Sequence, residues 1–121
     1  MAEITIEFTG QTRDLNEFSV ALFETEVLGA GTRKEIVGGG TITMQQMMMR
    51  RGYGIPQFIE IVLSTRDSVA AGIATNYIYE TLTKHKSEDL TVRINRRGVS
   101  INRHKIATMI NAEIANKSLS K

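Results

Sequence analysis

Residues 58–82 read FIEIVLSTRDSVAAGIATNYIYETL, and this stretch decides the fold. Its first six residues are apolar at both odd and even positions with one exception, which is typical of a strand in the middle of a sheet covered on both faces. Ser64, Thr65 and Asp67 then supply side-chain oxygens of the kind that begin helices. From Val69 onward, apolar and small residues recur in pairs every four positions. We therefore predict a central strand followed directly by an amphipathic helix.

The first turns of this helix are built from very small residues. Ala70, Ala71, Gly72 and Ala74 carry almost no side chain, so another backbone can approach them closely. That backbone belongs either to the sheet beneath the helix or to a second subunit, and the sequence leaves both possibilities open.

The N-terminal residues predict a strand and a helix. Residues 4–8 alternate apolar and polar side chains, which indicates a strand with one buried face. Over residues 14–28 the apolar positions fall at steps of three and four. We predict a helix there, with Asp14 accepting a free backbone N–H at its start and Gly29 closing it.

Residues 30–56 form a glycine- and methionine-rich segment. Three consecutive glycines, Gly38, Gly39 and Gly40, lose too much conformational entropy to lie inside a regular element. They predict a turn between two short strands or a mobile loop. The methionine-rich run MQQMMMRRGYGIP that follows is predicted to form one helical turn before Gly52.

The C-terminal third predicts a hairpin and a helix. Apolar side chains alternate over residues 90–94 and again from Val99 to Ile101, with the turn at 96–98. From Arg103 a last helix places Ile106, Met109, Ile110 and Ile114 on one face.

Together these elements predict an α/β protein of the α+β type. We expect one domain over residues 1–121, with a mixed sheet in strand, helix, strand, helix, hairpin order, packed by helices. Strands joined by a crossover helix are expected to pair in parallel.

Composition narrows the class of protein. The chain has 121 residues, is 41% hydrophobic and carries a net charge of +2, which fits one compact domain. It has no cysteine, so disulfides and thiolate metal sites are excluded. No stretch has the length of a membrane span and the first residues do not resemble a signal peptide, so we expect a cytoplasmic location.

The run FIEIVLSTRDSVAAGIATNYIYETLTKHKSEDLTVRINRRGVSI, residues 58–101, resembles the effector-associated constant component domains that accompany bacterial conflict-system effectors. The shared pattern is an apolar strand, a polar turn, a small-residue-rich helix, a charged linker and a strand that turns at Arg97-Gly98 into a last strand. The N-terminal strand and the helix containing Arg13-Asp14-Leu15 also take the places that this family assigns to them. The resemblance implies a non-catalytic adaptor or sensor module that recruits another component.

Candidate catalytic residues are few. Neither His85 nor His104 has a carboxylate or a second histidine at a helical ligand spacing. The stretch GAGTRKEIVGGGT lacks the residue order of a phosphate-binding loop. Glu60 interrupts the central strand, and it is interpreted either as a functional carboxylate or as one paired with an arginine such as Arg66 or Arg93. We expect no enzyme activity, cofactor or metal.

Charge is distributed unevenly, which favours binding to another macromolecule. Residues 1–30 carry six acidic and one basic side chain, whereas residues 84–105 carry seven basic and two acidic ones. The methionine cluster has two interpretations, an adaptable protein-binding surface or ordinary filling of the core under a loop, of which the second is favoured. The predicted partner-binding residues are Met47, Met48, Arg50, Arg51, Tyr53, Tyr79, Arg93, Arg96, Arg97 and Arg103.

The sequence thus predicts a protein-interaction module, an adaptor or regulatory component that self-associates or recruits a larger effector. The alternative is a nucleic-acid-binding protein that uses the basic C-terminal hairpin. Its contact residues would be Arg93, Arg96, Arg97, Arg103 and Lys105.

Overall fold

The computed structural model of the chain describes residues 2–48, 57–84 and 90–119. None of the helices in these ranges combines the length and the apolar composition needed to cross a bilayer. In chain order the elements are β1 (Ala2–Thr9), α1 (Thr12–Phe23), β2 (Arg33–Ile36), β3 (Gly40–Met48), β4 (Phe58–Thr65), α2 (Ser68–Lys84), β5 (Thr91–Ile94), β6 (Arg97–Val99) and α3 (Arg103–Leu119).

The strands form one sheet in the order β2-β3-β4-β1-β5-β6, and every neighbouring pair is antiparallel. The α+β class predicted from the sequence is confirmed, but the parallel pairing is wrong. The strands that α2 connects, β4 and β5, do run in the same direction. However, β1 lies between them and pairs antiparallel with both, as in a split crossover.

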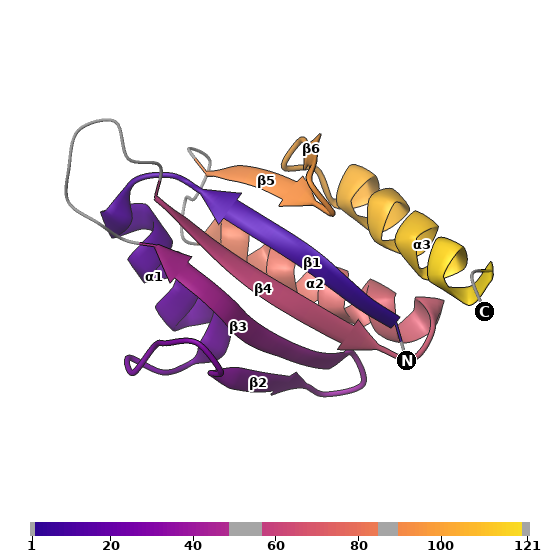
Figure 1. The fold of residues 1–121 in the computed structure, drawn as a ribbon, viewed down its shortest axis with the longest axis horizontal. Coiled ribbons are helices and arrows are strands. Elements are labelled where there is room, and N and C mark those ends of the chain that lie inside the picture. Colours follow the sequence, from indigo (N-terminus) through magenta and orange to yellow (C-terminus); the bar gives the residue numbers. More distant parts are fainter. Residues whose placement is uncertain (1, 49–56, 85–89, 120–121) are drawn as a thin grey trace.

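Helices cover one face of the sheet (Figure 1). In this view α1 and α2 lie behind the strands, while α3 lies beside the N-terminal half of β1, beyond the end of β5. Phe8 of β1 packs against Phe18 of α1 with ring centroids 4.6 Å apart. The other largest side chains of this core are Ile4, Ile6, Leu15, Leu22, Ile42, Met44, Ile59, Ile61, Leu63 and Ile78.

The opposite face of the sheet, called the open face below, is polar and partly exposed. Residues of the central strand β4 are alternately buried and half-buried, so this strand is central but covered on one face only. We predicted that helices cover both faces of β4, and this prediction is wrong. The helices bury the side chains on one face of the sheet and leave the other face partly exposed. The open face carries Glu3, Thr5, Glu7, Thr9, Thr41, Thr43, Phe58, Glu60, Val62, Ser64 and Arg93.

The first helix is shorter than predicted. It begins after Gln11, so Asp14 lies in the first turn and is not the capping residue. It ends at Phe23 because Glu24 adopts a left-handed backbone conformation with φ of 54°. The predicted extension to residue 28, with closure at Gly29, is therefore wrong.

The glycine-rich segment forms a β-hairpin, which confirms one of the two predicted possibilities. β2 is its short edge strand, and β3 is longer than predicted, since it continues through Met48. The helical turn predicted from Met44 onward is wrong over Met44–Met48, because Met44, Met47 and Met48 pair with β4. The rest of that run, residues 49–56, lies outside the described residues.

The C-terminal hairpin turns at Asn95-Arg96, one position before the predicted turn. Both residues have positive φ, 48° and 68°, as a two-residue type I′ turn requires. Asn95 also exchanges hydrogen bonds with the Thr5 backbone, and its side-chain amide donates to Glu113 of α3. Arg97 and Gly98 belong to β6.

Two predicted helices are confirmed. Asp67 caps α2, because its carboxylate accepts a hydrogen bond from the backbone N–H of Ala70 at 2.9 Å. In α3, Ile106 and Ile110 are buried, and Met109 and Ile114 pack against the core.

Candidate functional site

Three exposed apolar side chains gather where α2 approaches the β2–β3 turn. Val37 is 91% exposed, Val69 is 73% exposed and Ile73 is 40% exposed. Val69 and Ile73 are four residues apart on α2, and Ile73 lies against the backbone of the glycine turn that carries Val37. We call Val37, Val69 and Ile73 the apolar cluster.

The glycine turn holds Val37 at the surface. Gly39 donates a backbone hydrogen bond to Ile36 at 2.7 Å, and Gly38 adopts a φ of 76°. At Gly40, φ is 97° and an added Cβ would lie 2.1 Å from the backbone oxygen of Ser64. Only glycine adopts this positive φ without strain and has no Cβ to clash with the Ser64 oxygen. Gly40 therefore determines where the turn lies.

The helix side of the cluster follows from how α2 packs. Its buried residues include Ala71, Ala74, Ile78 and Leu82, so small side chains bring its first turns close to the rest of the fold. The predicted apolar stripe of α2 is wider than the surface that packs against it, so Val69 and Ile73 remain exposed to solvent. A backbone of the same chain that approaches these small residues is the β2–β3 glycine turn, since an added Cβ at Gly39 would lie 3.1 Å from the Ala74 nitrogen.

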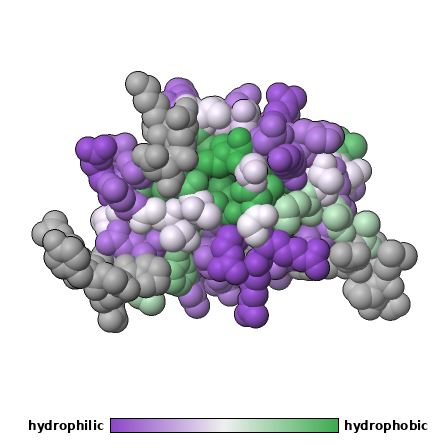
Figure 2. All heavy atoms as spheres, turned by 90° about the horizontal axis from the view of Figure 1, so that it is seen from above, coloured by the Kyte–Doolittle hydropathy of each residue, from purple (hydrophilic) through white to green (hydrophobic). Residues whose placement is uncertain are grey.

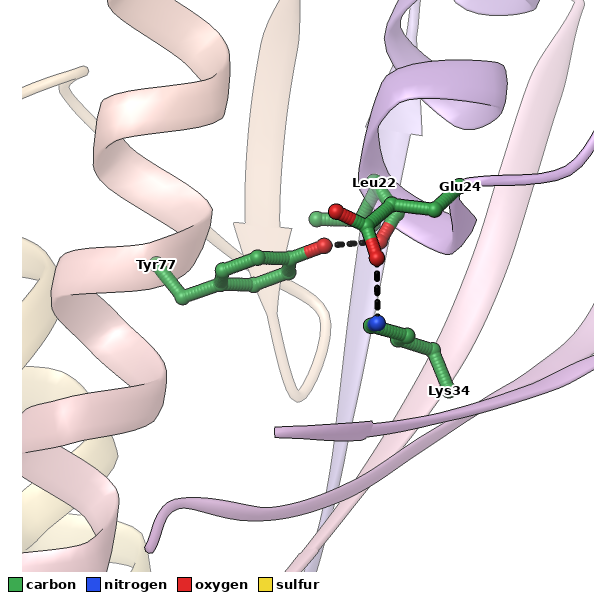
Figure 3. A network of polar contacts seen from close by, with 4 residues as sticks. All are labelled: Leu22, Glu24, Lys34 and Tyr77. Atoms are coloured by element: carbon green, nitrogen blue, oxygen red, sulfur yellow. Dashed lines mark hydrogen bonds and ion pairs between the residues drawn. The ribbon is translucent and has the colours of Figure 1, made fainter. Parts of the chain in front are cut away.

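Polar contacts fix β2 and α2 relative to the end of α1 (Figure 3). The Tyr77 hydroxyl donates a hydrogen bond to the backbone carbonyl of Leu22, and Lys34 of β2 forms an ion pair with Glu24. Burial raises the pKa of the Tyr77 hydroxyl, and the neighbouring Glu24 carboxylate raises it further. The hydrogen bond to Glu24 raises the pKa of the Lys34 ammonium group. Three elements are thus joined behind the apolar cluster.

A groove of about 400 Å³ runs between β2 and α2 beside these contacts. Its walls include Ile36 and Val37 from the hairpin and Ile73 and Tyr77 from the helix. Charged groups border it, because Glu24, Lys34, Glu35 and Glu80 line it as well. The arrangement is an apolar strip with a charged rim, which suits contact with another protein surface.

The methionines predicted to form a binding surface, Met47 and Met48, lie on opposite faces of the sheet. Met47 pairs with the buried Ile59 and packs against the core, whereas Met48 pairs with Phe58 on the open face and is 38% exposed. Tyr79 is half-buried against the core. The predicted contact residues Arg50, Arg51 and Tyr53 lie outside the described residues.

The predicted basic residues lie on different faces. Arg93 is on the open face, where its guanidinium lies 3.6 Å from Glu7 and donates a hydrogen bond to the Arg96 carbonyl at 3.0 Å. Arg97 pairs with Ile94, so it lies on the opposite side of the hairpin. Arg103 and Lys105 are exposed in the first turn of α3. A phosphate backbone that approached Arg93 would also meet acidic side chains of the open face.

Glu60 lies on the open face directly opposite Glu7 of β1, and Arg93 follows on β5. These three side chains line a depression of about 410 Å³ together with Asn95 and Arg96. Among the described residues, the ion pair of Arg93 is with Glu7, and no ion pair includes Glu60. Of the two predicted arginines, Arg93 is therefore near Glu60, and Arg66 lies in a different depression.

Among the described residues, the remaining candidates, His104 and the glycine-rich stretch, do not come together in one site. His104 is exposed in α3, and His85 lies outside the described residues. The glycine-rich stretch 29–41 forms a loop, β2 and the turn, so no helix follows it to hold a phosphate. Within the part of the chain that the structure describes, no three histidine, aspartate or glutamate side chains are grouped so that they could hold a metal ion.

Hydrophobic residues also gather on the side of the molecule where β5 and β6 lie, surrounded by hydrophilic ones (Figure 2). Val99, Ile101 and Met109 at this end are half-buried and pack against the core. The apolar cluster is the more exposed of the two surfaces.

Comparison of the chain with protein-family models, curated protein sequences and solved structures finds no significant match.

Proposed function

We propose that this chain is a protein-interaction module that works by associating with further copies of itself. The observation that carries this proposal is the apolar cluster, in which three large apolar side chains lie exposed at one edge of the sheet. Exposed apolar patches bordered by polar residues mark protein-binding surfaces. The adaptor role that the resemblance implies, recruitment of a larger component in a bacterial conflict system, is in keeping with such assembly.

The position of the cluster supports self-association in particular. It adjoins β2, an edge strand whose outer side lies next to no other strand of the sheet. The surface also combines both signs of charge, Lys34 and Arg33 with Glu35 and Glu80, so it can be complementary to a copy of itself. A strongly single-signed surface would favour a partner of opposite charge instead.

Sedimentation velocity over a range of protein concentrations tests the proposal. We expect a concentration-dependent rise in sedimentation coefficient for the wild type and its loss in Ile73→Lys. Met48→Lys is the matched control, because Met48 is exposed to nearly the same extent, 38% against 40%, but lies on the open face. A wild type that stays monomeric at every concentration would contradict the proposal.

Loss of self-association in Met48→Lys alone would also contradict it, since the contact would then lie on the methionine side of the sheet. Circular dichroism of each variant shows whether the fold is retained.

A further inference from the structure

The outer strand β2 has backbone groups available for pairing. It forms one margin of the sheet, and none of the described strands or helices lies beyond it in Figure 1. An unpaired edge of this kind is a template for another strand. The residues of β2 therefore decide what such a strand could be.

The hydrogen-bond pattern identifies the residues that face outward. Met44 of β3 donates to the carbonyl of Thr32 at 2.7 Å. Because successive residues of an antiparallel ladder bond to alternate sides, Lys34 and Ile36 bond toward β3. Arg33 and Glu35 then direct their backbone N–H and C=O groups away from the sheet.

The side chains of the two outward-bonding residues have opposite charges. Arg33 and Glu35 are both exposed and both lie on the open face, two positions apart. In an antiparallel pair of two β2 strands centred on Lys34, Arg33 of each copy stands directly opposite Glu35 of the other. Opposite charges in such cross-strand positions stabilise a sheet.

Other registers are less favourable. A shift of two residues places Arg33 opposite Arg33, or Glu35 opposite Glu35, and like charges directly opposite destabilise pairing. A shift of one residue would require the backbone groups of Lys34 or Ile36 to bond to the second copy, but these groups already bond to β3. The charges on β2 therefore favour one antiparallel register over the neighbouring ones.

Lys34 would meet Lys34 of the second copy at the centre of this contact. Each of these ammonium groups is already paired with the Glu24 carboxylate of its own chain. The ion pair therefore reduces the repulsion that two opposing lysines would otherwise produce.

The same register extends the contact to exposed apolar residues. It brings the Val37 end of one β2 to the Gly31 end of the other. The loop before Gly31 carries Val27, which is 83% exposed. The register thus directs the exposed Val37 of each copy toward the loop that carries the exposed Val27 of the other.

We propose that two copies of this chain pair antiparallel through β2, centred on Lys34, so that one sheet continues across a two-fold dimer. This inference rests on the proposed function and specifies its geometry. A single four-residue strand with its flanking apolar residues buries less than the roughly 1,600 Å² of a standard interface, so we expect a reversible dimer at about micromolar concentrations or above.

Charge exchange tests the register with the full chain. Arg33→Glu alone and Glu35→Arg alone place like charges at both contact positions, so each should raise the dimer dissociation constant about tenfold or more. An equimolar mixture of the two variants restores opposite charges at both positions and should form a heterodimer. The double variant Arg33→Glu/Glu35→Arg should form a homodimer again. Sedimentation equilibrium measures all four, and both positions are exposed, so the fold is expected to persist.

The possible failures are distinguishable. If the wild type dimerises and both single variants dimerise equally well, the β2 register is wrong, while self-association through another surface stands. If both single variants lose the dimer but their mixture does not restore it, direct pairing of Arg33 with Glu35 is also overturned. If the wild type is monomeric up to about 1 mM, both the register and the proposed function fail.

Discussion

The hydroxyl group of Tyr77, on α2, donates a hydrogen bond to the backbone carbonyl of Leu22 in the last turn of α1. The last carbonyls of a helix have no partner within the helix, so this contact satisfies one of them from a different element. The contact lies at the early end of α1, five residues before its predicted end, next to the ion pair of Glu24 with Lys34 (Figure 3).

Removing this hydroxyl should destabilise the fold. We expect Tyr77→Phe to lower the free energy of unfolding by about 1 kcal/mol, because a half-buried carbonyl loses its partner. Urea denaturation measures the change. Tyr79→Phe is the control on the same helix, since among the described residues no hydrogen bond involves the Tyr79 hydroxyl. Equal effects of the two variants would show that the Leu22 contact contributes nothing specific.

Alkaline pH should weaken the same contact. The pKa of Tyr77 is raised above its ordinary value of 10.0 by burial, so the folded protein holds the phenolic proton more tightly than the unfolded chain. Its contribution to stability is complete below about pH 10 and is lost as pH rises through the folded-state pKa. The Lys34 shift has the same sign and adds to the loss in the same direction. Because Lys34 is present in both proteins, the stability difference between wild type and Tyr77→Phe should shrink through the Tyr77 shift alone, in denaturation curves recorded as the pH rises above about 10.

The glycine turn gives a sharper prediction. Gly40→Ala should destabilise the protein by about 3 kcal/mol or more, because the new methyl group meets the Ser64 oxygen and φ is positive. Gly72→Ala is the control within α2, where an added Cβ meets nothing within 4 Å. It should stabilise the helix by about 1 kcal/mol. Thermal unfolding measures both, and a Gly40→Ala protein of unchanged melting temperature would refute the described turn.

The β5–β6 turn contains a residue that is poorly suited to its backbone. Arg96 has a φ of 68°, and its described hydrogen bond uses the backbone carbonyl, which glycine would retain. We expect Arg96→Gly to stabilise the protein by about 0.5 to 1 kcal/mol in chemical denaturation. Asn95→Gly should instead destabilise it, since the Asn95 side chain bonds to Thr5 and Glu113. A destabilised Arg96→Gly variant would mean that the arginine side chain makes a stabilising contact.

Glu60 and Glu7 stand directly opposite each other on β4 and β1. Because like charges in these positions oppose strand pairing, Glu60→Gln should raise the free energy of unfolding by about 0.5 kcal/mol. The gain should decrease in high salt, which screens the repulsion. Glu3→Gln is the control, since Glu3 lies opposite Ser64. Loss of stability in Glu60→Gln would identify the carboxylate as a paired group.

Part of the candidate site was visible in the sequence. Three successive glycines predict a turn, but no sequence pattern identified Val37 beside them as an exposed apolar residue. The α2 stripe holds two residues in each turn, which is more than one narrow contact can cover. Sequence reasoning nevertheless placed Val69 and Ile73 in the buried stripe, because periodicity shows which residues share a helix face but not how far the neighbouring element extends.

Local patterns determined β1, β4, α2 and α3, because alternation and helical spacing depend on the chain's own period and on caps such as Asp67. Tertiary structure alone decided the order of the strands, the extension of β3 through the methionines and the early end of α1. Each of these depends on a partner distant in sequence: β1 inserts between β4 and β5, β3 pairs with β4, and Tyr77 bonds to Leu22. Which side of α2 stays exposed also depends on tertiary structure. The pairing of the sheet, and not the helix itself, determines how far the edge strand extends along α2.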